Sequence, residues 1–262
     1  MDAPDLILYC HCCHGQSGPE RPEVLRRLLL GGGTVAATGD LCELAARQGP
    51  ALVEALAGAG RLRVAACSER AVRALLAFAG LPAQDVDVLN LRHAAPADID
   101  AFARAAARDS LDTDFTLERR GPLVMLRAGS GAVAAAIAAA LPELTARGNW
   151  VPWFPVIDRS RCTRCRQCAG FCLFGVYAAD EAGVRVVKPD GCKTNCPACA
   201  RICPAGAIIF PKYAHGPING EPPEAGGPAE PMGVELAKLA GPDVMEQLRR
   251  RAAGQNTGVD PK

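Results

Sequence analysis

The stretch CTRCRQCAGFCLFGVYAADEAGVRVVKPDGCKTNCPACARICP, from Cys162 to Pro204, holds eight of the thirteen cysteines in this chain of 262 residues. The cysteines form two runs, Cys162-x-x-Cys165-x-x-Cys168-x-x-x-Cys172 and Cys192-x-x-x-Cys196-x-x-Cys199-x-x-x-Cys203-Pro204. A cubane iron–sulfur cluster needs four converging thiolates, of which a cysteine loop supplies three and a more distant part of the chain the fourth. The pattern therefore predicts two 4Fe–4S clusters.

The second run is irregular, because three residues separate Cys192 from Cys196 where two are usual. If the extra residue loops out, Cys192 still reaches its iron; otherwise one corner is open and a three-iron cluster results. The intact Cys203-Pro204 favours the first alternative. Structural zinc in this region is a further alternative, which eight cysteines in this order disfavour.

Residues 156–210 repeat one unit twice: a strand, a cysteine loop, a short helix and a strand. On these residues the segment resembles bacterial dicluster ferredoxins, although Leu173 stands where the first half often has proline. The resemblance implies a small α+β fold whose halves exchange their last cysteines. The implied ligands are Cys162, Cys165, Cys168 and Cys203 for cluster 1, and Cys192, Cys196, Cys199 and Cys172 for cluster 2.

Composition and charge restrict the compartment and the partners. A formal net charge of +1 gives no reason to expect nucleic acid as a partner. The longest apolar run, residues 132–141, is too short to insert into a membrane. The odd cysteine count, the tight spacing and the absence of a secretory signal argue against a disulfide scaffold. We therefore expect a cytoplasmic protein, since metal-binding thiols need a reducing compartment.

The N-terminal part predicts a separate α/β domain. Strands are expected at 6–9, 34–38, 61–66 and 86–91, and helices at 23–30, 50–58, 69–79 and 97–108. This alternation is typical of a Rossmann-like parallel sheet with helices on its faces. Ligands gather beyond the carboxyl ends of such strands, where four cysteines fall: Cys10, Cys12, Cys42 and Cys67.

These four cysteines have two interpretations. Buried cysteines commonly serve as small apolar core residues, and for Cys42 or Cys67 alone we would favour that role. Four thiols at one rim instead indicate a third metal site. Cys13, His11 and His14 are weaker candidates, and the two histidines keep zinc open as an alternative occupant.

The first hundred residues resemble the N-terminal domain of the flavin-bearing subunit of heterodisulfide reductase. The resemblance lies in Tyr9-Cys10-His11-Cys12, Cys42, Ala65-Ala66-Cys67-Ser68 and Asn90-Leu91-Arg92. It implies a third 4Fe–4S cluster held by Cys10, Cys12, Cys42 and Cys67. Two residues depart from the family pattern: Cys13 stands where the family usually has glycine, and Glu69 stands where it often has proline.

A flavin domain follows in that family, and the strand 123–128 before Gly129-Ser130-Gly131 has the outline of a dinucleotide fold. No acidic residue ends a second strand about twenty residues later, and the ferredoxin-like segment begins too soon. We expect no FAD or NAD.

The expected domains are 1–112 (cysteine-bearing α/β), 113–155 (bridging strand, helix and aromatic linker), 156–212 (dicluster ferredoxin) and 213–262 (a Gly/Pro-rich tail with short helices).

No acid–base or nucleophile arrangement stands out, so we predict no catalytic residues. We expect an electron carrier, or a non-catalytic oxidoreductase subunit, passing single electrons through two or three 4Fe–4S clusters to a redox partner protein. The alternative is a redox- or iron-responsive adaptor whose clusters are mainly structural.

Overall fold

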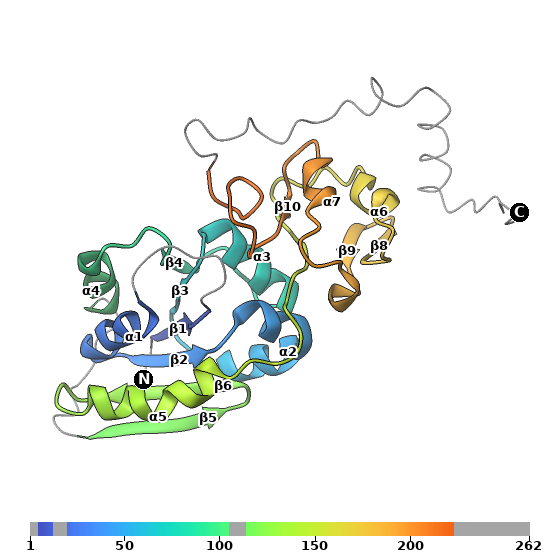
Figure 1. The fold of residues 1–262 in the computed structure, drawn as a ribbon. Coiled ribbons are helices and arrows are strands. Elements are labelled where there is room, and N and C mark those ends of the chain that lie inside the picture. The colour runs from blue at the N-terminus through green and yellow to red at the C-terminus, as the bar shows by residue number, and fades with distance from the viewer. Residues whose placement is uncertain (1–4, 13–19, 105–113, 223–262) are drawn as a thin grey trace, which may run out of the picture. The chain divides into compact units, whose positions relative to one another are not determined.

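The computed structural model describes residues 5–12, 20–104 and 114–222, and the chain divides into two compact units, Met1–Pro152 and Trp153–Lys262 (Figure 1). The sequence predictions for Cys13, His14 and residues 223–262 lie outside the described residues, as does the end of the predicted helix 97–108. None of the helices within the described ranges is long and apolar enough to cross a membrane.

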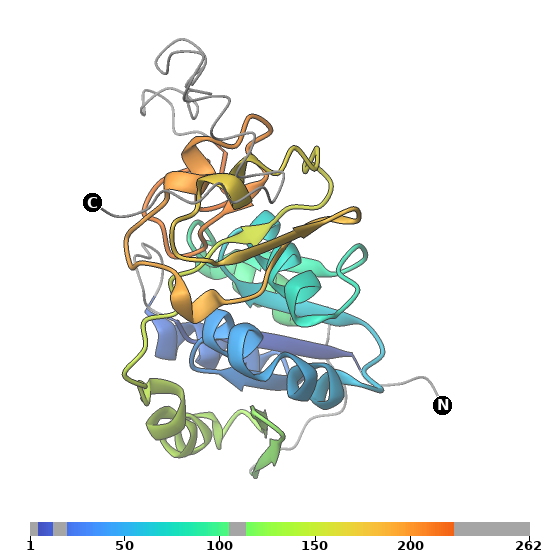
Figure 2. The ribbon, with the colours of Figure 1, turned by 90° about the vertical axis from the view of Figure 1, so that its right-hand side faces the viewer.

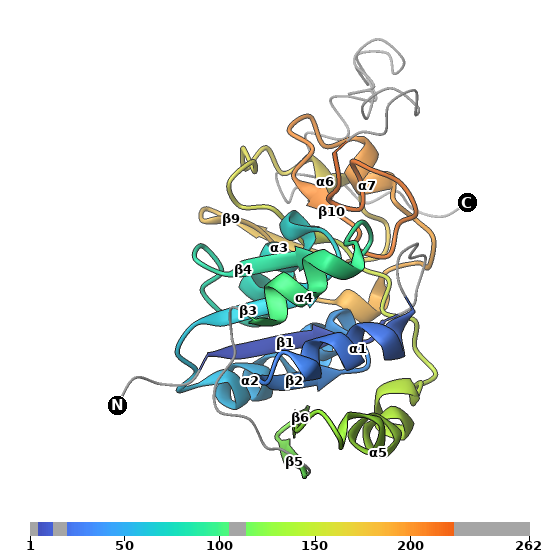
Figure 3. The ribbon, with the colours of Figure 1, turned by 90° about the vertical axis from the view of Figure 1, so that its left-hand side faces the viewer.

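Unit 1 is built on a six-stranded sheet of order β4-β3-β1-β2-β6-β5 (Figure 3). The strands are β1 (Leu6–Cys10), β2 (Thr34–Thr38), β3 (Leu62–Ala66), β4 (Asp87–Asn90), β5 (Phe115–Arg120) and β6 (Leu123–Ala128). The first four are parallel, whereas β6 is antiparallel to both β2 and β5. The sheet is therefore mixed and not purely parallel as predicted, because a tight turn with Gly121 at φ +54° sends β6 back along β5.

Helices cover both faces of this sheet. Helices α2 (Leu41–Leu56) and α3 (Glu69–Ala79) pack against each other, while α1 (Arg21–Leu30) packs against α4 (Pro96–Arg104) and α5 (Val133–Thr145). On the α1 side, the apolar positions of α1 join side chains of β1, α4 and α5 in one buried core, since they recur at helical spacing: Val24, Leu25, Leu28 and Leu29.

Helix α2 begins nine residues before the predicted helix 50–58. Asp40 starts it, because its carboxylate accepts hydrogen bonds from the N–H groups of Cys42 and Glu43 at 3.0 and 3.3 Å. Gln48 is not helical (φ −134°), and it lies two residues before Pro50. Pro50 is a residue that often begins a helix, which explains why the sequence predicts a start at residue 50. Cys42 therefore lies in the first turn of a helix.

Unit 2 contains two small antiparallel pairs, β7 (Val156–Ile157) with β10 (Ile208–Ile209), and β8 (Tyr177–Asp180) with β9 (Gly183–Val186) (Figure 2). Short helices α6 (Gln167–Phe171) and α7 (Ala198–Arg201) follow the two cysteine loops, and η1 (Pro189–Gly191) precedes the second. This order repeats the same unit twice. The core contains aromatic and aliphatic side chains with three cysteines, Cys168, Cys199 and Cys203.

Two leucines of α1 provide a test of the core of unit 1. Leu28 is fully buried, whereas Leu30 on the same helix is 46% exposed. Leu28→Ala should lower the free energy of unfolding by about 2–5 kcal/mol, because it removes buried methyl groups and leaves a cavity. Leu30→Ala, the matched control, should change it by about 0.5 kcal/mol or less. Urea unfolding followed by circular dichroism measures both, and equal effects would contradict this packing.

Candidate metal centres

The first cysteine loop of unit 2 turns sharply between its thiols. Arg164 and Arg166 have φ of 59° and 61°, in the left-handed region that non-glycine residues seldom adopt. In the second loop Asn195, directly before Cys196, has φ of 62°, just as Arg164 stands directly before Cys165. Asparagine tolerates this conformation best after glycine. The two loops therefore correspond at Cys165 and Cys196, and the extra residue lies between Cys192 and Asn195.

Four cysteines of unit 2 line one cavity of about 260 Å³, and they come from both runs: Cys172, Cys192, Cys196 and Cys199. Burial raises the pKa of the Cys199 thiol to about 12, with further increases from neighbouring Cys192, Cys172 and Cys196. Burial likewise raises the pKa of Cys192 to about 12, and Cys196 and Cys172 add to it. These four thiols are thus mutual electrostatic neighbours, and Cys192 is among them.

Cys168 lies close to cysteines of both runs. Burial raises the pKa of Cys168 to about 12, and Cys199, Cys203 and Cys165 raise it further. The N–H of Ala207 donates to Sγ of Cys203 at 3.3 Å. Cys162 packs on the same core. Since Cys168 neighbours both Cys203 and Cys199, the two groups of thiols adjoin.

A tyrosine that the sequence analysis missed lies against one of these thiols. The hydroxyl of Tyr177, on β8, donates to Sγ of Cys199 at 3.1 Å. Burial raises the pKa of Tyr177 well above its ordinary value, so the phenol keeps its proton and remains a donor. The sequence signal was its position in the repeat, five residues after Cys172.

Within the described ranges, no group of three or more His, Cys, Asp or Glu side chains is close enough to hold a single metal ion. A cubane has a different requirement, because each of its four thiolates binds a different iron at the corner of the cluster. The thiols around the cavity suit that chemistry: they are soft ligands, surrounded by apolar residues, and the phenol of Tyr177 donates to one of the sulfurs.

The four cysteines of unit 1 are all buried, with 4–7% of their surfaces exposed. Cys10 ends β1, Cys67 directly follows β3, and Cys42 follows β2 in the first turn of α2. Because β3, β1 and β2 are parallel neighbours, these positions meet at one edge of the sheet. A hydrogen bond with Cys12 is the main cause that raises the pKa of Cys10, followed by burial. The N–H of Leu41 donates to Sγ of Cys10 at 3.3 Å.

His11 lies between two of these cysteines and is buried, with Nδ1 3.0 Å from the hydroxyl of Tyr9. Burial lowers its pKa to about 4, with Arg21 and Arg147 adding to the effect, so the ring is neutral near pH 7. The hydroxyl of Tyr9 also donates to the carbonyl of Arg21 at 2.8 Å. His11 therefore belongs to a buried polar chain next to the thiols.

Two adjoining groups of thiols in a repeated strand–loop–helix unit define an iron–sulfur electron-transfer domain. Residues 154–222 match the family described as a 4Fe-4S dicluster domain. In Methanocaldococcus jannaschii, an uncharacterized ferredoxin is 45% identical over 62 residues, which are 23% of this chain and 42% of that protein. Pyruvate synthase subunit PorD of the same organism is 36% identical over 61 residues, 23% of this chain and 70% of that protein.

The chain therefore belongs to the 4Fe–4S dicluster ferredoxin family. The similarity lies in unit 2, and the chain spans less than half the length of the first of these relatives.

The irregular cysteine gives a direct test. Cys192→Ala should lower the iron content by about one to four atoms per chain, because the lost thiolate leaves one corner without a ligand, so that either one iron or the whole cluster is lost. Iron and sulfide analysis of anaerobically purified protein measures this. Thr194→Ala, an exposed change in the same loop, is the matched control and should leave the iron content unchanged. Full iron content and an unaltered EPR spectrum in Cys192→Ala would show that Cys192 is not a ligand.

Proposed function

We propose that this protein is an electron carrier that serves as a subunit or partner of an oxidoreductase complex, with two 4Fe–4S clusters in unit 2 and a third in unit 1. The main support is the cavity of about 260 Å³ shared by four cysteines from the two runs. A cluster bound there supplies reversible one-electron chemistry. The reducing conditions that such thiols need favour the cytoplasm.

In unit 2, we assign Cys172, Cys192, Cys196 and Cys199 to one cluster, and Cys162, Cys165, Cys168 and Cys203 to the other. The crossing of Cys172 and Cys203 between halves is supported by the electrostatic neighbours of Cys192 and of Cys168. Because Cys168 neighbours Cys199, the two clusters would lie next to each other. That proximity suits electron passage from one to the other.

In unit 1, we assign Cys10, Cys12, Cys42 and Cys67 to the third cluster. The parallel order β3-β1-β2 brings three of the four positions to one edge. The order changes direction between β1 and β3, a place where α/β sheets form their ligand crevices. Cys42 also benefits from its place in the first turn of α2, since a helix N-terminus stabilises a thiolate.

An oxidoreductase complex is the proposed setting because PorD is named as a subunit of pyruvate synthase. The similarity to PorD covers unit 2 alone. Neither FAD nor NAD takes part in the proposed transfer, and the chain would pass electrons without transforming a substrate itself.

Iron content tests the third cluster. With three cubanes the anaerobic protein should contain about twelve irons per chain, and Cys67→Ala should lower this to about eight. Cys13→Ala, the matched control, removes the one cysteine outside the three assigned sets and should leave the content unchanged. About eight irons in the unaltered protein, with no loss in Cys67→Ala, would contradict a cluster in unit 1.

Reduction tests the carrier role itself. Dithionite should reversibly bleach the visible absorbance of the anaerobic protein and produce the EPR signals of reduced 4Fe–4S clusters. Clusters that stay oxidised throughout would support the structural adaptor instead.

A further inference from the structure

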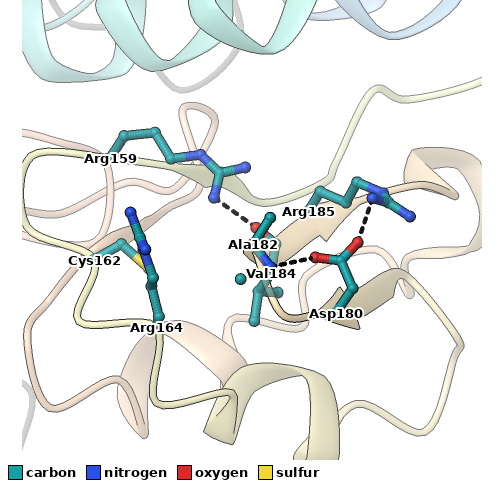
Figure 4. Close-up of a pocket in the computed structure, with 8 residues that line it drawn as sticks. Arg159, Cys162, Arg164, Asp180, Ala182, Val184 and Arg185 are labelled. Atoms are coloured by element: carbon teal, nitrogen blue, oxygen red, sulfur yellow. Dashed lines mark hydrogen bonds and ion pairs between the residues drawn. The ribbon is translucent and has the colours of Figure 1, made fainter.

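Unit 2 carries a basic pocket of about 330 Å³ next to Cys162 (Figure 4). Three arginines line it, Arg159, Arg164 and Arg185, with Asp180 as the one carboxylate among the described lining residues. The chain as a whole is almost neutral, at +1, so this excess of positive charge is local. We propose that this pocket is the docking site for an acidic side-chain cluster on the redox partner, so that electrons are exchanged at the Cys162 side of unit 2.

The three guanidinium groups differ in what holds them. Arg159 donates to the carbonyl of Val184 at 2.6 Å, which keeps its full charge. Arg185 forms an exposed ion pair with Asp180 at 2.6 Å, so the carboxylate of Asp180 already balances the charge of Arg185. Among the residues that the structure describes, no hydrogen bond or ion pair engages the guanidinium of Arg164. Two positive charges therefore have no counter-charge in the described pocket wall.

The position of Arg164 is fixed by the backbone and by packing. Its φ of 59° places it in the turn of the cysteine loop, two residues after Cys162. Its side chain lies along the β8–β9 turn, so close that a Cβ at Gly183 would be 3.4 Å from Arg164 Cγ. The neighbouring Arg166 donates to the carbonyl of Asp180 at 2.7 Å and ties the loop to the same turn. The aliphatic part of the Arg164 side chain therefore lies against this turn, while the residue as a whole remains exposed to a partner.

An acidic partner is the occupant that charge complementarity favours. Arginine recognises carboxylates through paired N–H donors, and complementary charge accelerates the encounter of two proteins. The proposal rests on the proposed function, since Cys162 must hold a cluster for the site to matter. Electron exchange with small redox dyes of opposite charge tests it even while the partner is unidentified.

In stopped-flow oxidation of the dithionite-reduced protein, dianionic anthraquinone disulfonate should react about threefold or more slowly with Arg164→Gln than with the unaltered protein at low salt. Added salt should reduce the difference, because it screens the pocket. The rate with the cation phenosafranine should not fall in Arg164→Gln. Arg201→Gln, on α7 outside the pocket, removes the same charge and should leave the disulfonate rate unchanged.

Equal disulfonate rates for Arg164→Gln and the unaltered protein, or an equal loss in Arg201→Gln, would overturn the docking site. Failure of the proposed function has a different signature, since the protein would then lack reducible visible absorbance altogether. Iron content of each variant confirms that its clusters are intact.

The hydrogen bond from Tyr177 to Cys199 makes the two halves of the repeat different. In the repeat, Cys172 with Tyr177 corresponds to Cys203 with Ile208, five residues apart in each half. Cys199 therefore has a phenol donor at 3.1 Å, whereas the residue equivalent to Tyr177 in the other half is an aliphatic side chain. We infer that Tyr177 raises the reduction potential of the cluster that Cys199 holds, and so makes the two halves unequal.

The physical reason is the charge that reduction adds. A donated hydrogen bond to a ligand sulfur stabilises the more negative, reduced cluster, and the effect is larger in a buried site. Tyr177 is well placed for this, because its hydroxyl donates to Sγ of Cys199 at 3.1 Å. This inference also rests on the proposed function.

Tyr177→Phe removes only the hydroxyl. It should lower the midpoint potential of one cluster by about 59 mV, a tenfold change in its one-electron equilibrium, and leave the other cluster unchanged. EPR-monitored redox titration measures both. Tyr213→Phe is the matched control, because the hydroxyl of Tyr213 accepts from Arg201 at 3.3 Å and contacts no thiol among the described residues. Unchanged potentials in Tyr177→Phe with full iron content would overturn the inference, whereas absent iron in the unaltered protein would overturn the proposed function.

Discussion

The core of unit 2 consists partly of cysteine sulfur. Cys168, Cys199 and Cys203 pack with Trp153, Ile208 and Phe210 in a single buried group, so three of the proposed ligands are also core residues. Burial raises the pKa of the Cys168 and Cys199 thiols to about 12, which means that these groups resist ionisation unless a cation compensates them. Metal binding would release those protons and couple cluster assembly to folding. Such cross-links would add stability to a domain of this size, whose strands are short.

In unit 1 the cysteines have a different relation to the core. Its core is an ordinary α/β core of aliphatic side chains, and its cysteines lie at the rim where parallel strands end. Cys10, Cys12, Cys42 and Cys67 do not belong to that core. A cluster at this rim would therefore be added to a core that is packed without these thiols, whereas thiols of unit 2 are part of the core itself. Loss of iron should affect the two units differently for this reason.

The cysteine spacing identified the dicluster family, because the ligand chemistry requires closely spaced thiols and little else can replace them. The alternation of strands and helices likewise gave the first four strands of unit 1 in their correct places. Predictions failed where local signals conflicted. Pro50 suggested a late start for α2, but Asp40 caps the helix at Leu41. β5 was missed, because its sequence FTLERR is charged and exposed at the edge of the sheet.

By itself, the sequence determined the family of unit 2 and the two runs of closely spaced cysteines, since spacing along the chain controls which thiols a loop can present together. The tertiary structure alone decided what surrounds them. Tyr177 and Arg185 lie on the β8–β9 hairpin. Tyr177 donates a hydrogen bond to Cys199, and Arg185 lines the cavity beside Cys162. Likewise only the strand order β3-β1-β2 brings Cys67, Cys10 and Cys42 to one edge. These contacts join residues far apart in sequence, and no local pattern encodes which of them will meet.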